Sequence, residues 1–325
     1  MSASVRIGII GAGFGARVVA PVFAETDGCE VVEVVSARDD AVVRELCVRR
    51  DLDLVAVHSP PFLHPAHLGY ALDAGHAVLC DKPFGRNAQD AADMLDHARA
   101  AGALHLGNLE FRYQPGRVTL RELANTGAIG VVEHVEVAQF SAGSRVPLRN
   151  YGWLFDAERG GGWIGAWGSH FLDYVRWTFG EVVECGADLR TDIEERPDAD
   201  GVLHTCTAED AFVAWLRTER GVSITIDTTF VAPVNLPSRV TVIGSDGALE
   251  LRSDHRITRT TADGSDEVFR LDVTAADPHL IPMQRWAEVV RDSVRAGVPA
   301  PDAATLEDGL ACAQIMDRLR GRPRS

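Results

Sequence analysis

The chain has 325 residues, 46% hydrophobic and 24% charged, which is typical of globular proteins and long enough for two domains. Its formal net charge of −15 argues against nucleic acid or an anionic membrane as a partner, and no apolar run reaches membrane-spanning length. The few residues before the first predicted strand are too short for a signal peptide, and the six scattered cysteines contain no C-x-x-C pair, so we expect a reduced, cytoplasmic protein without a zinc site.

The first third of the chain alternates short apolar segments with helical patterns. Strands are predicted at Val5–Ile10, Val31–Ser36, Leu54–His58, Ala77–Cys80 and Leu104–Leu106, and helices at Phe14–Glu25, Ala41–Arg50, Ala66–Ala74 and Ala88–Ala101. This alternation is typical of βαβ units wound around a parallel sheet.

A glycine-rich turn follows the first strand, with the pattern G-x-G-x-x-A. The first glycine suits the tight turn, the second lets the backbone approach a pyrophosphate, and a small third residue allows close packing of helix and strand. An ordinary strand–helix turn is the alternative. We predict a dinucleotide-binding Rossmann domain in which the cofactor contacts Gly11, Gly13, Phe14, Gly15 and Ala16.

The second strand ends in Ser36-Ala37-Arg38. It lacks the acidic residue that usually holds the ribose 2′-hydroxyl of NAD about 20 residues after the glycines. Arginine suits a phosphate dianion, because its guanidinium makes bidentate, charge-assisted hydrogen bonds. Ser36 and Arg38 therefore favour NADP over NAD. The alternative is a solvated Arg38 neutralised by Asp39 and Asp40.

A serine–proline motif, Ser59-Pro60-Pro61, follows the third strand, with His64 three residues later. The carboxyl end of a parallel sheet is where open α/β folds bind ligands. Ser59, Pro60 and His64 are therefore predicted to contact the cofactor, with a purely structural loop as the alternative of equal weight.

The fourth strand ends in Asp81-Lys82-Pro83. A lysine at a strand end, fixed by the following proline, can reach both the nicotinamide edge and a substrate hydroxyl. A loop lysine is otherwise usually a surface charge. We predict that Asp81 and Lys82 contact the cofactor and that Lys82 is catalytic.

After about residue 108 the pattern changes to longer strands in hairpin order, with turns such as Asp246-Gly247. Strands are predicted at Val131–Phe140, Val182–Leu189, Thr207–Arg217, Val222–Phe230, Arg239–Ile243 and Ala248–Leu251, with helices at Pro115–Asn125, Gly168–Phe179, Leu280–Ala296 and Leu306–Arg320. We therefore predict an α/β Rossmann domain over residues 1–108 and, over residues 109–325, an α+β domain with a large, mostly antiparallel open sheet.

Three glycines, Gly160 to Gly162, precede the second of these helices, and we expect them to let the backbone approach a ligand closely. His170 and Asp173 then fall at positions i and i+3, on one face near the helix start. Histidine titrates near neutrality and can exchange a proton with an alcohol or a carbonyl. A buried structural histidine is the alternative.

Together the motifs G-x-G-x-x-A, S-P-P-x-x-H, D-K-P and G-S-H-x-x-D resemble those of the glucose–fructose oxidoreductase/inositol dehydrogenase (Gfo/Idh/MocA) family. The resemblance covers nearly the whole chain, including the segment 108–115. It implies NAD(P)-dependent hydride transfer at a hydroxyl or ketone carbon of a sugar, cyclic polyol or related small molecule. It also implies a second domain that binds substrate and whose open sheet forms the interface of a homodimer or homotetramer.

The resemblance further implies roles for individual residues. Lys82 and His170 would share proton transfer. The substrate site would be lined by Arg112, Trp153, Trp163, Trp167, His170 and Asp173, because flat apolar faces suit pyranose rings.

Three departures from the family pattern stand out. Asp81 replaces the usual glutamate, Ala166 stands where the family has an aspartate, and the stretch between Arg38 and Asp53 is short by about one helix–strand unit. They keep two alternatives open: a cofactor-retaining hydrolase or epimerase, and a non-catalytic NADP-binding regulatory protein.

Overall fold

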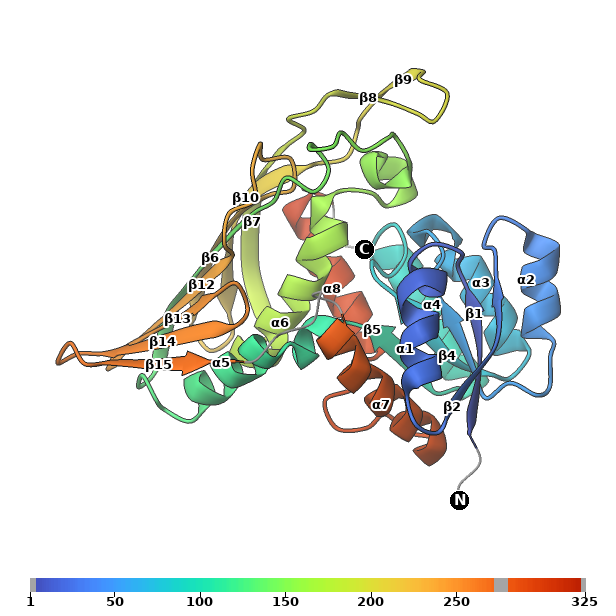
Figure 1. The fold of residues 1–325 in the computed structure, drawn as a ribbon, viewed down its shortest axis with the longest axis horizontal. Helices are drawn as coiled ribbons and strands as arrows, with labels where there is room; N and C mark the ends of the chain where they lie inside the picture. The colour runs from blue at the N-terminus through green and yellow to red at the C-terminus, as the bar shows by residue number, and fades with distance from the viewer. Residues whose placement is uncertain (1–3, 272–279, 323–325) are drawn as a thin grey trace. The chain divides into compact units, whose positions relative to one another are not determined.

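The computed structural model describes residues 4–271 and 280–322. The chain divides into two compact units. The first unit contains a five-stranded parallel sheet with the order β2-β1-β3-β4-β5 (Figure 1). Its strands are β1 (Val5–Ile10), β2 (Cys29–Val35), β3 (Leu54–Val57), β4 (Ala77–Asp81) and β5 (His105–Asn108).

The helices of this unit are α1 (Ala20–Glu25), α2 (Asp40–Cys47), α3 (His64–Asp73), α4 (Ala88–Ala101) and α7 (Leu280–Ala296). The connection from β1 to β2 runs toward one edge of the sheet, and the connections from β2 to β3, β3 to β4 and β4 to β5 run toward the other edge. Because such crossovers are right-handed, α1 covers one face of the sheet and α2, α3 and α4 cover the other. The strand order reverses between β1 and β3, which is where such sheets bind ligands.

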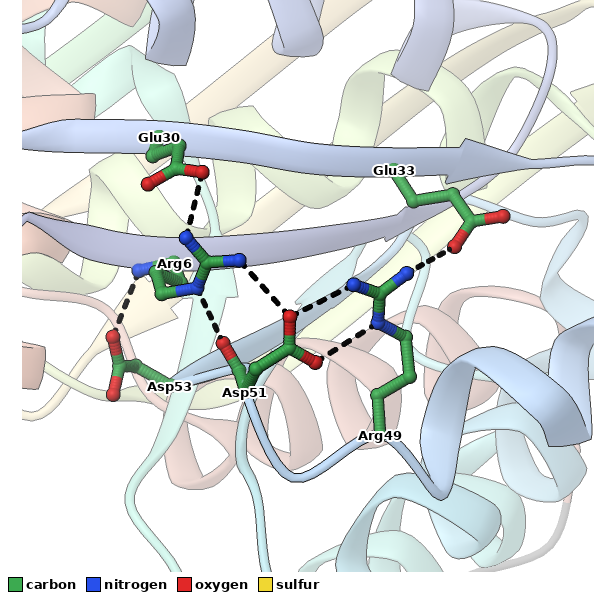
Figure 2. Close-up of polar contacts among 6 residues, drawn as sticks. All are labelled: Arg6, Glu30, Glu33, Arg49, Asp51 and Asp53. Atoms are coloured by element: carbon green, nitrogen blue, oxygen red, sulfur yellow. Dashed lines mark hydrogen bonds and ion pairs between the residues drawn. The ribbon is translucent and has the colours of Figure 1, made fainter.

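Strand β2 is an edge of this sheet, because α2 alone connects it to β3, which pairs with β1. This connection agrees with the short stretch predicted between Arg38 and Asp53. An ion network ties the amino ends of the strands together, away from the glycine turn; it joins Arg6, Glu30, Glu33, Arg49, Asp51 and Asp53 (Figure 2). Charged side chains along an edge strand disfavour pairing with another strand.

The second unit contains an eight-stranded sheet with the order β15-β14-β13-β12-β6-β11-β10-β7. Its strands are β6 (Val132–Phe140), β7 (Val182–Arg190), β10 (Ala211–Thr218), β11 (Ser223–Thr229), β12 (Arg239–Gly244), β13 (Gly247–Arg252), β14 (Arg256–Thr261) and β15 (Asp266–Arg270). Only β11 and β6 run parallel among these neighbours. A separate hairpin consists of β8 (Glu195–Pro197) and β9 (Leu203–Thr205). The predicted fold class is confirmed.

Helices α5 (Pro115–Asn125) and α6 (Ser169–Phe179) lie on the same side of the large sheet (Figure 1). Alternation along β10 and β11 buries Ala214, Leu216, Ile224 and Ile226 on one face. The other face exposes Trp215, which is 50% accessible. The strand predicted at Val222–Phe230 therefore alternates buried and exposed residues, and one face of the sheet is open.

The two compact units do not follow a single cut at residue 108. The first consists of the chain up to Glu110 together with α7 and the start of α8 (Leu306–Leu319), which it contains up to Gln314. The second consists of the segment that begins at Phe111 and of the rest of α8, from Ile315. A helix contributed from the far end of the chain leaves no local signal, because its apolar face specifies burial but not the partner that it packs against.

In the described ranges no helix is long and apolar enough to cross a bilayer. All six cysteines are free thiols. Among the same residues, no three His, Cys, Asp or Glu side chains gather as metal ligands.

Candidate functional site

The glycine turn after β1 is shaped by three different constraints. Gly11 has φ +144°, and a Cβ there would lie 2.5 Å from the His58 carbonyl oxygen. A Cβ on Gly15 would lie 3.1 Å from both the His58 Cβ and Ile9 Cγ2, so a small residue is needed for close packing. No described atom lies within 4 Å of a Cβ built on Gly13. The backbone at Gly13 therefore faces open space, which is the condition that a bound pyrophosphate requires.

The chain leaves the turn through a π-helical segment, Gly15–Val19, before α1 begins. Phe14 and Ala16 are half-buried there. The predicted helix over Phe14–Glu25 is present, and its first part is a π-helix. Single π-turns occur frequently at functional sites.

Arg38, at the end of β2, is exposed, and its guanidinium makes no hydrogen bond or ion pair with any described residue. Its backbone N–H donates to Ser36 Oγ at 3.3 Å. The two neighbouring acids are used elsewhere: Asp39 caps α2, and Asp40 pairs with Arg44 at 2.8 Å. The guanidinium at this strand end is therefore available to an anionic ligand.

A buried polar cluster joins the ends of β3, β4 and β5. Asp81 Oδ1 accepts hydrogen bonds from the Lys82 backbone N–H (2.9 Å) and from Asn108 Nδ2 (3.0 Å). Asp81 Oδ2 lies 3.3 Å from His58 Nδ1. Burial raises the pKa of Asp81, but the adjacent His58 ring and nearby cations outweigh it and hold that pKa below its ordinary value. Asp81 is thus an anion that fixes the backbone of Lys82, whose own side chain is half-buried.

His64 is fully buried. Its Nε2 lies 2.6 Å from the Ser59 carbonyl oxygen and its Nδ1 lies 3.6 Å from Cys80 Sγ. Burial lowers the pKa of His64 to about 4, so the ring is neutral at pH 7. The prediction that His64 contacts the cofactor is therefore corrected: the buried ring supports the Ser59–Pro60 loop through its hydrogen bond with the Ser59 carbonyl oxygen.

In the second unit, Arg112 and Asp173 form a bidentate ion pair, with Nε–Oδ2 at 2.7 Å and NH2–Oδ1 at 2.6 Å. Their side chains are 6% and 0% exposed. The prediction that both line the substrate site is therefore corrected, because each satisfies the other inside the unit. The pair ties the segment after Glu110 to α6.

His170, in the first turn of α6, is 3% exposed. Its ring stacks on Phe111 with centroids 4.5 Å apart, and the Arg117 guanidinium lies 4.0 Å from the Phe111 ring. This stacking fixes the orientation of the imidazole. Its catalytic role stays a prediction.

Two of the tryptophans predicted to line the substrate site, Trp163 and Trp167, belong to a stack of aromatic rings. Trp163 stacks on Phe230 at 4.5 Å and on Trp167 at 5.9 Å, and Trp167 also stacks on Phe171 at 5.2 Å. Trp167 is buried, so we assign it to core packing, whereas Trp163 is half-buried and its place in the substrate site stays a prediction. Trp153 packs half-buried against the cluster around Phe230 and stays a candidate.

The glycines before α6 accommodate the protein itself. A Cβ on Gly161 would collide with the Trp153 carbonyl oxygen, and one on Gly162, at φ +106°, with the Glu209 carboxylate. That carboxylate accepts hydrogen bonds from the Ile164 N–H (3.1 Å) and from Arg320 (2.7 Å). The expected approach of this backbone to a ligand is corrected accordingly.

Two residues that the sequence reasoning missed belong to the polar cluster, His58 and Asn108. A signal for each was present, since His58 closes an apolar run directly before Ser59 and Asn108 closes the fifth strand. Lys82 has a further distinction: it is the only lysine in the chain, whereas the other 31 of the 32 lysine and arginine residues are arginine.

The sequence matches two family models. One, an oxidoreductase family with an NAD-binding Rossmann fold, covers residues 5–108, and the other, the GFO/IDH/MocA C-terminal domain, covers residues 118–250. An uncharacterised oxidoreductase of Synechocystis sp. is 30% identical over 272 residues, which are 78% of this chain and 73% of that protein. A D-apiose dehydrogenase of Paraburkholderia graminis is 25% identical over 317 residues, 89% of this chain and 76% of that one.

Solved structures resemble the fold closely. Levoglucosan dehydrogenase in complex with NADH and L-sorbose has a TM-score of 0.86, with 98% of this chain and 96% of that chain covered. The sequence identity is 18%, so this likeness concerns the fold alone.

Proposed function

The chain belongs to the GFO/IDH/MocA oxidoreductase family, and we propose that it is an NADP-preferring enzyme that interconverts a hydroxyl and a ketone on a sugar-like small molecule. Two observations carry the proposal: open space at Gly13, and a guanidinium at Arg38 that has no partner among the described residues. The glycine turn would hold the pyrophosphate, and Ser36 with Arg38 would hold the 2′-phosphate. A bound nicotinamide supplies the hydride acceptor or donor. The names of the D-apiose and levoglucosan dehydrogenases support a sugar-like substrate class.

Lys82 is the residue that we assign to the reacting oxygen. The chain uses arginine at every other cationic position, yet has lysine here. An ammonium is a compact donor that can also lose its proton, whereas a guanidinium is always charged. Lys82 would polarise a carbonyl oxygen or take the proton of an alcohol, while Asp81 holds its backbone in place. His170 would act as a second proton-transfer group or orient the substrate, since Ala166 offers no carboxylate.

The cofactor preference is tested by replacing Arg38 with alanine. Charge-assisted bonds to a phosphate contribute about 1.5–3 kcal/mol, so wild type is expected to bind NADP(H) about one to two decades more tightly than NAD(H). Arg38→Ala removes that difference and leaves NAD(H) affinity nearly unchanged. Fluorescence titration of both cofactors measures it, with Arg44→Ala as a control because Arg44 is already paired with Asp40. Equal affinities in wild type would contradict the preference.

We also propose that the protein is a homodimer and that the open face of the large sheet is its interface. One register row across that face has acids at one end, Asp188 and Asp227, and arginines at the other, Arg239, Arg252, Arg256 and Arg270. A two-fold axis parallel to the strands would place the acidic end of one copy over the basic end of the other. Val213 and Trp215, 43% and 50% exposed, supply apolar surface on the same face.

Charge reversal tests this arrangement. Asp188→Arg/Asp227→Arg is expected to be monomeric, and so is Arg252→Glu/Arg256→Glu, because each variant sets like charges against each other. Mixing the two variants should restore a dimer that contains one copy of each. Light scattering at micromolar concentration reads the result. A monomeric wild type, or variants that still self-associate, would refute the interface.

A further inference from the structure

His58 lies between the glycine turn and the end of β4. Its carbonyl oxygen packs against Gly11 and its Cβ packs against Gly15. The centroid of its ring lies 6.3 Å from that of the Phe14 ring. On its other side, Nδ1 lies 3.3 Å from Asp81 Oδ2. The side chain is fully buried, and neither ring nitrogen has a hydrogen-bond partner in the described part of the chain. The contact between Nδ1 and the Asp81 carboxylate is therefore electrostatic, at ion-pair distance.

Asp81 continues the connection toward Lys82. Its second oxygen accepts the Lys82 backbone N–H at 2.9 Å, and Asn108 holds the same oxygen at 3.0 Å. The backbone of the glycine turn packs directly against the His58 backbone, because a Cβ added to Gly11 would lie only 2.5 Å from the His58 carbonyl oxygen. Close-packed interiors transmit displacement because they cannot absorb it. A shift of the turn must therefore move His58, and with it the carboxylate that positions Lys82.

We propose that His58 is a positioning residue that links the glycine turn to Lys82 through Asp81, so that a pyrophosphate bound at the turn changes the surroundings of the Lys82 amine. The inference rests on the proposed function only in taking the turn as the pyrophosphate site. It assigns a role to a residue outside the motifs that predicted the site. Contact between Lys82 and the nicotinamide is not required for it.

The single lysine makes the test direct. Reductive methylation with ¹³C-formaldehyde labels Lys82 as the only side-chain amine and preserves its charge. The probe is 2′-phospho-ADP, which carries the pyrophosphate but lacks both the nicotinamide ring and the ribose that bears it. A shift of the Lys82 methyl signal on saturation with this fragment then reports a change transmitted through the protein. Calorimetry measures fragment affinity in parallel.

Wild type should show the shift, and His58→Ala should lose it while still binding the fragment, about threefold to thirtyfold more weakly. His58→Asn keeps a donor near the Nδ1 position and should restore most of the shift. Asp81→Asn should lose it as His58→Ala does. His67→Ala, which removes another buried histidine of the same unit, should leave it unchanged.

Two outcomes separate the inference from the function on which it rests. A fragment that binds wild type without moving the Lys82 signal, or that still moves it in His58→Ala, overturns the role of His58 alone. A fragment that does not bind wild type contradicts the proposed cofactor site, and the inference falls with it.

Discussion

Lys82→Arg is expected to lower kcat by about 10²–10⁴-fold with little change in NADP(H) affinity, which is the usual effect of losing a general acid or base. The substitution keeps the positive charge, but a guanidinium cannot release a proton at neutral pH. Single-turnover kinetics followed by the absorbance of the reduced cofactor measure it. Arg86→Lys is the matched control, because it makes the reverse exchange on the same loop at a side chain that pairs with Asp90. A near-wild-type rate in Lys82→Arg would remove Lys82 from the chemistry.

His170→Ala is expected to show a loss of the same order. If Lys82 and His170 serve the same reacting atoms, the double variant loses less than the product of the two single losses, because groups that act as a unit are not additive. Full additivity would mean that the two residues contribute independently.

Breaking the Arg112–Asp173 pair is expected to cost about 3–5 kcal/mol of stability, since removing one partner leaves a buried charge uncompensated. Asp173→Leu and Arg112→Met should each show this loss as a lower denaturant midpoint. The double substitution should recover most of it, because well-packed apolar residues replace such pairs at little cost.

The exposed pair Arg285–Glu288 on α7 gives the comparison, with side chains 66% and 44% exposed. Arg285→Met should change stability by at most about 1 kcal/mol. If Asp173→Leu lowers the free energy of unfolding no more than this control does, the buried ion pair does not stabilise the second unit as its geometry implies.

The Rossmann half of the fold was accessible from the sequence because its signals are local. The glycine turn directly follows β1, and the strand–helix alternation fixes the order of the elements. Strands β10 and β11 were equally readable, since one buried and one exposed face alternate along them. Strands β14 and β15 were missed because both are mostly polar, and β15 is an exposed edge.

The substrate side was poorly predicted because its residues are defined by distant partners. Arg112 and Asp173 are 61 positions apart, and an isolated arginine gives no sign that its partner will be an internal carboxylate. Trp163 stacks on Phe230, which lies on another part of the chain. His58 was overlooked because a histidine at the end of an apolar strand passes as the last strand residue, and its role depends on Asp81 in the next strand.

We place NADP-dependent turnover of a sugar-like hydroxyl or ketone at Lys82. The most direct test incubates wild type and Lys82→Arg with NADPH and a panel of ketosugars, and with NADP and the corresponding alcohols, while the reduced cofactor and the products are both followed. We predict that wild type changes the cofactor in step with product and that Lys82→Arg does so at least about 10²-fold more slowly. Product formed without net change in the cofactor, or tight NADP binding with no turnover on either panel, would contradict the account.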